Sequence, residues 1–98
     1  MRAVLISTLD GPGAVTVADV PEPGGDGVVI DVHAAGVAFP DALLSRGLYQ
    51  YKPDLPFSPG GEVAGVVRSA PDGAHVRAGD RVLGLTMITG GMAEVVVL

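Results

Sequence analysis

The 98-residue sequence contains no cysteine and no tryptophan. Without cysteine the chain can form no disulfide, no thiolate nucleophile and no cysteine-ligated zinc site. Histidine is nearly absent too, and a metal site would need His33 or His75 together with carboxylates brought close by the fold. We expect His33 to be an ordinary strand residue and His75 to lie in a polar loop. The sequence therefore predicts no metal site.

Basic residues are also few, because 6 lysines and arginines stand against 11 acidic residues and the formal net charge is −5. No basic cluster is present, which argues against binding to nucleic acid or to an anionic membrane. No apolar run approaches the roughly 20 residues of a membrane helix. The N-terminal apolar stretch reaches Asp10 and Gly11 too early for a signal peptide. We expect a cytoplasmic protein that contacts neither nucleic acid nor membrane.

Glycine and proline are abundant, with 15 and 8 residues, and valine is present 16 times against 3 isoleucines. This composition disfavours long helices and favours short strands separated by many turns. Hydrophobic residues make up 48% of the chain, which is high for a single small domain. We therefore expect one apolar face that another domain or subunit covers.

A mainly β fold with short helices is predicted from the pattern of apolar segments and turns. Strands are expected over residues 2–7, 14–20, 28–35, 60–69, 81–85 and 92–98. The first two indicate a hairpin, and the nearly continuous apolar run of the third predicts burial on both faces. Pro40 can begin a short helix that Gly47 ends in a left-handed conformation. Short strands in this order suggest a partly open barrel.

No catalytic set can be assembled from the residues alone. The segment 11–16 starts like a dinucleotide fingerprint, but a threonine replaces its third glycine and a strand follows, so a plain turn is expected. The segment 60–65 lacks both the spacing and a preceding strand. Ser58, His33 and Asp41 could form a triad on paper, yet no nucleophile elbow surrounds any serine. The residues by themselves support a small β-rich domain without a phosphate-binding loop.

Taken as an ordered series, five motifs are specific. They are Ala-Gly-Val-Ala-Phe-Pro-Asp at 35–41, Gly-Leu-Tyr at 47–49, Leu-Pro-Phe-Ser-Pro-Gly-Gly-Glu-Val-Ala-Gly-Val-Val at 55–67, Gly-Asp-Arg-Val at 79–82 and Gly-Gly-Met-Ala-Glu at 90–94. The series resembles the N-terminal, GroES-like catalytic domain of the medium-chain dehydrogenase/reductase superfamily. It is most similar to the zinc-independent NADPH:quinone oxidoreductases.

The resemblance implies a GroES-like, partly open β-barrel and a hydride transfer from NADPH to a quinone or an electron-poor alkene. Zinc alcohol dehydrogenases have a cysteine ligand at the position of Ala38 and a histidine ligand at that of Gly61, and neither residue here can bind metal. The resemblance also implies that NADPH lies between this domain and a Rossmann domain, which binds most of the cofactor.

Site residues follow from the same resemblance. Ala38, Phe39 and Asp41 are expected at the cofactor side of the cleft, with Asp41 also a helix cap. Ala38 stands where members of this branch usually carry an asparagine that faces the nicotinamide. Tyr49 is expected to line the substrate cleft and to donate its hydroxyl to a substrate oxygen, or else to pack on its loop. Leu43 and Met92 are expected as apolar walls of the substrate cleft, with core packing as the alternative.

The family's GxGxxG motif would lie beyond Leu98, so we interpret residues 1–98 as an incomplete N-terminal catalytic domain without its Rossmann domain. The whole protein is expected to be a homodimer, and the 98-residue chain alone to be inactive. One alternative is a reductase of enoyl thioesters or other α,β-unsaturated carbonyls. The other is a non-catalytic GroES-like module that binds a partner through its apolar face.

Overall fold

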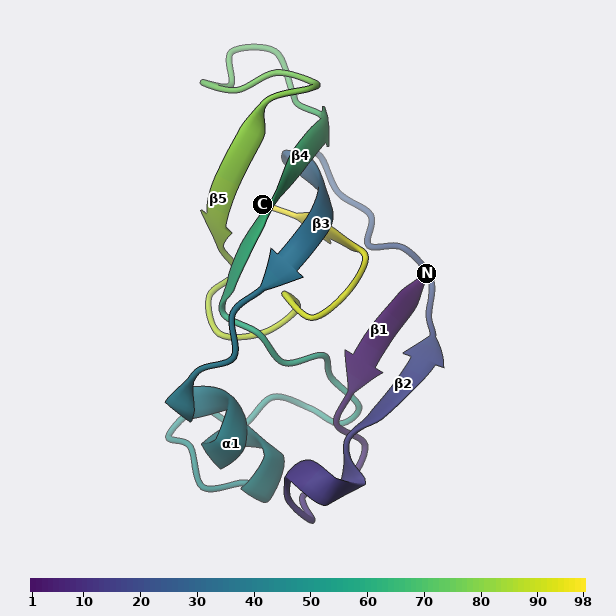
Figure 1. Ribbon diagram of the computed structural model, residues 1–98, viewed down its shortest axis with the longest axis vertical. Helices are drawn as coiled ribbons and strands as arrows, with labels where there is room; N and C mark the ends of the chain where they lie inside the picture. Colours follow the sequence, from purple (N-terminus) through teal and green to yellow (C-terminus); the bar gives the residue numbers. More distant parts are fainter.

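Two antiparallel sheets and one short helix make up the computed structural model, which describes residues 1–98 (Figure 1). A two-stranded sheet pairs β1 (Arg2–Leu5) with β2 (Thr16–Asp19). A four-stranded sheet has the order β5-β4-β3-β6. Its strands are β3 (Val29–Ala35), β4 (Glu62–Ser69), β5 (Arg81–Leu85) and β6 (Val95–Val97). The helix α1 (Phe39–Arg46) and the 3-10 turn η1 (Pro12–Ala14) lie together at one end of the molecule (Figure 1).

The two sheets meet without closing into a complete barrel. Single bridges join Ala3 to Ala93 and Ile6 to Phe57. The backbone N–H of Val4 donates to the Met92 carbonyl at 2.8 Å. These few contacts hold the sheets together and leave their other edges open, so the predicted mainly β, partly open fold is confirmed.

The local elements form where their sequences predict them. The β1–β2 pair is the expected hairpin, and the glycine-rich segment within it is a turn that contains η1. Helix α1 has Pro40 in its first turn and ends at Gly47, whose φ of 68° is left-handed. Glycine accepts this conformation without a steric penalty, which is why the helix stops there.

Two expectations about the strands are wrong. The third strand was predicted to be buried on both faces, but only Ile30 is fully buried and His33 and Ala34 are exposed. Side chains cover one face of this sheet, where Ile30, Val63 and Val96 form the core. The last strand is shorter than residues 92–98, because the segment before Val95 crosses between the sheets, with the N–H of Glu94 bonded to the Arg2 carbonyl and its own carbonyl to Val32.

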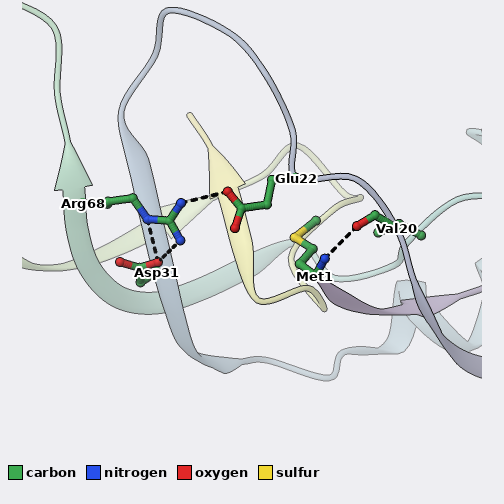
Figure 2. Close-up of polar contacts among 5 residues, drawn as sticks. All are labelled: Met1, Val20, Glu22, Asp31 and Arg68. Atoms are coloured by element: carbon green, nitrogen blue, oxygen red, sulfur yellow. Dashed lines mark hydrogen bonds and ion pairs between the residues drawn. The ribbon is translucent and has the colours of Figure 1, made fainter.

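A polar cluster on the surface ties the loop after β2 to the larger sheet (Figure 2). Arg68 Nη1 lies 2.8 Å from a Glu22 oxygen, and its Nη2 lies 2.5 Å from Asp31 Oδ1. The hydrogen bonds to Asp31 and then to Glu22 raise the pKa of Arg68 above its usual range. Nearby, the N-terminal ammonium of Met1 donates to the Val20 carbonyl at 2.8 Å. The chain contains no helix with the length and apolar character needed to span a bilayer.

Candidate functional site

A cavity of about 250 Å³ lies between the start of α1 and the first strand. It brings together three of the predicted site residues, Ala38, Asp41 and Met92, although they are far apart in the sequence. Most of its wall is apolar. The complete lining is Val4, Ile6, Pro12, Val15, Val37, Ala38, Asp41, Ala42, Ser45, Pro59 and Met92.

The other predicted site residues lie outside this cavity. Phe39 begins α1 with 75% of its surface exposed. Leu43 lies half-buried on the same helix, and Tyr49 lies half-buried in the loop that follows it. The roles expected for these three side chains stay predictions.

Asp41 is the buried acid of the site, with only 9% of its surface exposed. One carboxylate oxygen, Oδ2, accepts the N–H of Ala38 at 2.8 Å, which caps the helix start as predicted. The other oxygen, Oδ1, accepts the N–H of Gly60 at 3.0 Å. Both oxygens therefore accept backbone N–H groups. The main role of this buried carboxylate is to fix the local backbone geometry, and any chemical role comes second.

Two further lining residues, Pro59 and Met92, belong to backbone segments that are bound to each other, residues 58–61 and 86–92, which together form one wall. Met92 N–H donates to the Pro59 carbonyl at 2.9 Å, and Gly91 N–H to the Gly60 carbonyl at 2.9 Å. The Thr86 hydroxyl donates to the same Gly60 carbonyl at 2.5 Å. Gly60 has a φ of 104°, and a Cβ on it would lie 2.8 Å from Met92 N. No side chain fits there, so glycine is required.

Sequence reasoning did not identify Gly60 or Thr86, which hold the backbone behind Pro59 and Met92. The signal that could have found this wall is the pair of Gly-Gly dipeptides, at 60–61 and 90–91, because two backbones that pack this closely exclude side chains.

The chemistry that the cavity offers is limited. No lysine, arginine or histidine lines it. The Ser45 hydroxyl donates to the Ala42 carbonyl at 2.7 Å within the helix. No group of three or more histidine, cysteine or acidic side chains is placed to hold a metal ion. The walls therefore fit a small, uncharged, largely apolar ring better than an anion.

A second surface, the outer face of β3, β4 and β5, is apolar and open. Leu83 and Leu85 on β5 are 87% and 74% exposed. They border a shallow depression of about 660 Å³ whose floor is formed by small residues such as Ala64 and Gly84. This surface has the character of the apolar face that the composition predicts.

A family model described as the alcohol dehydrogenase GroES-like domain matches residues 24–98. The chain belongs to this family. This GroES-like domain is 38% identical to the quinone oxidoreductase of Rattus norvegicus and 40% identical to that of Homo sapiens, each over 98 residues. Both matches cover 96% of the chain and 30% of the relative.

Solved structures agree with this assignment. A probable oxidoreductase from Mycobacterium abscessus is 50% identical, with a TM-score of 0.94 over 100% of this chain and 32% of that chain. The Escherichia coli quinone oxidoreductase complexed with NADPH is 28% identical, with a TM-score of 0.83 over 97% of this chain and 30% of that chain. The predicted relationship to quinone oxidoreductases of the medium-chain dehydrogenase/reductase superfamily is confirmed. The GroES-like domain spans about 30% of the length of these curated relatives.

Proposed function

We propose that this GroES-like domain is the N-terminal catalytic domain of an NADPH-dependent oxidoreductase that transfers a hydride to a quinone or a similar electron-poor acceptor. The observation that carries this proposal is the similarity to quinone oxidoreductases over nearly the whole chain. One of the similar structures is a complex with NADPH. When bound, NADPH supplies the hydride.

The residues of this chain fit the place where such a cofactor meets its acceptor. The apolar cavity beside α1 has room for one flat, uncharged ring, which we propose is the ring of the acceptor, with Ala38 and Met92 among its walls. Its lining contains no cationic side chain to bind a phosphate. We therefore assign phosphate binding to a Rossmann domain in the remaining length of the protein, and we propose that this domain lies against the GroES-like domain.

The role of this chain is then to orient the ring and to exclude water from the acceptor. Tyr49 is our candidate for a hydroxyl that donates to the acceptor oxygen, and Leu43 and Phe39 are candidates for further apolar walls. In the whole protein, Tyr49→Phe is expected to lower kcat by about tenfold or more if the hydroxyl transfers a proton. An unchanged kcat assigns Tyr49 to loop packing.

Zinc has no part in the proposed reaction. Ala38 and Gly61 stand at the positions of the zinc ligands in zinc alcohol dehydrogenases, and neither side chain has a donor atom. We also propose that the whole protein is a homodimer, which sedimentation of the purified protein tests directly.

The test is an assay of the full-length protein with NADPH and a panel of acceptors, following NADPH oxidation by absorbance. We expect turnover with simple quinones that is unchanged after dialysis against a chelator. Turnover restricted to enoyl thioesters or enones would replace the quinone assignment with the related reductase activity. The absence of turnover with every acceptor would favour a binding module that acts through the apolar face.

A further inference from the structure

We propose that Asp41 is a positioning residue that sets the width of the acceptor cavity. The proposal rests on the function proposed above and deepens it, because it names the residue that determines which acceptors fit. Its basis is the bridge that one carboxylate makes between two segments that line the cavity, the start of α1 and the segment that carries Pro59.

The two walls are built separately. One wall is the start of α1, where Asp41 Oδ2 accepts the Ala38 N–H at 2.8 Å. The other is the Pro59–Met92 wall, where backbone hydrogen bonds join two segments that are distant in the chain. The hydrogen bond from Gly60 N–H to Asp41 Oδ1, at 3.0 Å, is the only one that links α1 to residues 58–61.

Gly60 couples Asp41 to the wall that contains Pro59 and Met92, because hydrogen bonds hold the peptide groups on both sides of this glycine. Its carbonyl accepts the Thr86 hydroxyl and the Gly91 N–H, while its N–H donates to Asp41. A left-handed φ of 104° and the absence of room for a Cβ leave the glycine no alternative position. A change at Asp41 therefore moves one wall relative to the other and does not simply loosen a loop.

Asp41 has no side-chain oxygen without a partner, since both oxygens accept backbone N–H groups and the residue is buried. Asparagine has the same shape but only one acceptor oxygen, and its amide N–H₂ would face an N–H donor on the other side. D41N must give up one of the two hydrogen bonds, which frees the walls to separate.

The experiment uses the full-length protein and compares D41N with wild type on a one-ring and a two-ring quinone. We expect D41N to lower kcat/KM for the one-ring quinone about tenfold. The ratio of kcat/KM for the two-ring over the one-ring acceptor should rise, because a wider cavity disfavours the small acceptor most. KM for NADPH should stay within about twofold, since the cofactor is held mainly by another domain.

Asp80→Asn is the matched control, because it makes the same substitution at a second carboxylate that accepts a backbone N–H. Asp80 Oδ2 accepts the Arg77 N–H at 2.9 Å in an exposed turn, and neither residue lines the cavity. The acceptor ratio of D80N should therefore equal that of wild type even if the melting temperature falls. Hydrogen exchange adds a second measurement, in which D41N should exchange the amide of Gly60 or of Ala38 faster and D80N should change neither.

A D41N protein that melts earlier but keeps the wild-type acceptor ratio overturns the proposal and leaves Asp41 as a helix cap only. If D41N does not fold, D41E replaces it. Its longer side chain should raise the same ratio, and an unchanged ratio overturns the proposal equally. A wild-type protein that reduces no acceptor overturns the proposed function itself, an outcome distinct from active protein with an unchanged ratio.

Discussion

The cavity beside α1 and the outer face of β4 and β5 are both lined mainly by apolar residues, but the first region is tightly packed and the second is exposed. In the cavity, the buried Asp41 satisfies two backbone N–H groups, and Gly60 lies too close to Met92 to carry a side chain. On the outer face, Leu83 and Leu85 lie mostly in solvent. The first region completes its hydrogen bonding and packing within these residues, whereas the second does not.

The comparison shows that buried apolar residues stabilise the fold, whereas exposed apolar residues are available to bind another surface. Fully burying a leucine side chain stabilises a protein by about 1.5–3 kcal/mol relative to leaving it exposed. Leu83 and Leu85 contribute little of this within the chain, while their exposure makes the face suitable for another surface. The proposed second domain is our candidate for that surface.

The largest expected effect compares two added methyl groups, one against backbone and one against a movable side chain. Gly60→Ala forces a Cβ against Met92 N at a φ of 104°, and we expect it to lower the free energy of unfolding by about 3 kcal/mol. Gly84→Ala, whose Cβ points to the core face of β5 and away from the exposed Leu83 and Leu85, meets chiefly the end of the Leu98 side chain, which can move, and should cost less than about 1 kcal/mol. Urea denaturation of both variants measures the difference. Equal losses would contradict the assignment of the Gly60 cost to a tight backbone contact in the cavity region.

A second prediction concerns the covering of the outer face. In the full-length protein, Leu83→Lys is expected to lower the free energy of unfolding by about 2 kcal/mol, because the proposed second domain buries this leucine. Leu48→Lys, in the loop after α1, is the control and should change stability by less than about 0.5 kcal/mol. Chemical denaturation is again the measurement. A Leu83→Lys protein as stable as wild type would mean that the face is bare.

A third prediction uses the strained loop that leads into the cavity wall. Met87 has a φ of 58° and is almost fully exposed, so its side chain adds strain with little burial. Met87→Gly should raise the free energy of unfolding by about 1 kcal/mol, because glycine adopts this conformation freely. Met87→Ala keeps the Cβ and is expected to change stability by less than about 0.5 kcal/mol. Thermal melting of the two variants decides, and an equal gain in both would place the effect in the side chain.

The smallest effect is a pH dependence at the surface where β1 meets the segment before β6. The backbone N–H of Arg2, and next its side chain, lower the pKa of Glu94 below its ordinary value of 4.5. A carboxylate whose pKa is lower in the folded state stabilises the protein above its unfolded pKa, and this contribution disappears as the pH falls through the folded pKa.

The melting temperature of wild type should therefore exceed that of Glu94→Gln slightly at neutral pH, and the two should converge in acid. The effect is small because the Arg2–Glu94 pair is exposed. Glu62→Gln is the control for the loss of one carboxylate, since the Glu62 side chain accepts no hydrogen bond, and at neutral pH its melting temperature should stay close to that of wild type. A difference between wild type and Glu94→Gln that persists unchanged in acid would contradict the assignment to ionised Glu94.

Much of the fold could be predicted because it depends on neighbouring residues. The hairpin, the helix between Pro40 and Gly47, and the strand at 81–85 all follow from local turn chemistry and propensity. The third strand was predicted less well, since an apolar run does not state how many faces of a sheet are covered. The ion pairs of Arg68 were not predicted, because Asp31 is 37 residues away and Glu22 is 46 residues away.

By itself the sequence determined the mainly β fold, the family, and the absence of donor atoms at Ala38 and Gly61, because these depend on residue type and on the order of motifs. Only the tertiary structure decided that the second oxygen of Asp41 accepts the N–H of Gly60, 19 residues away, and that Leu83 faces solvent. The physical reason is that hydrogen bonds between distant backbone segments, and the burial of a sheet face, depend on how the elements pack.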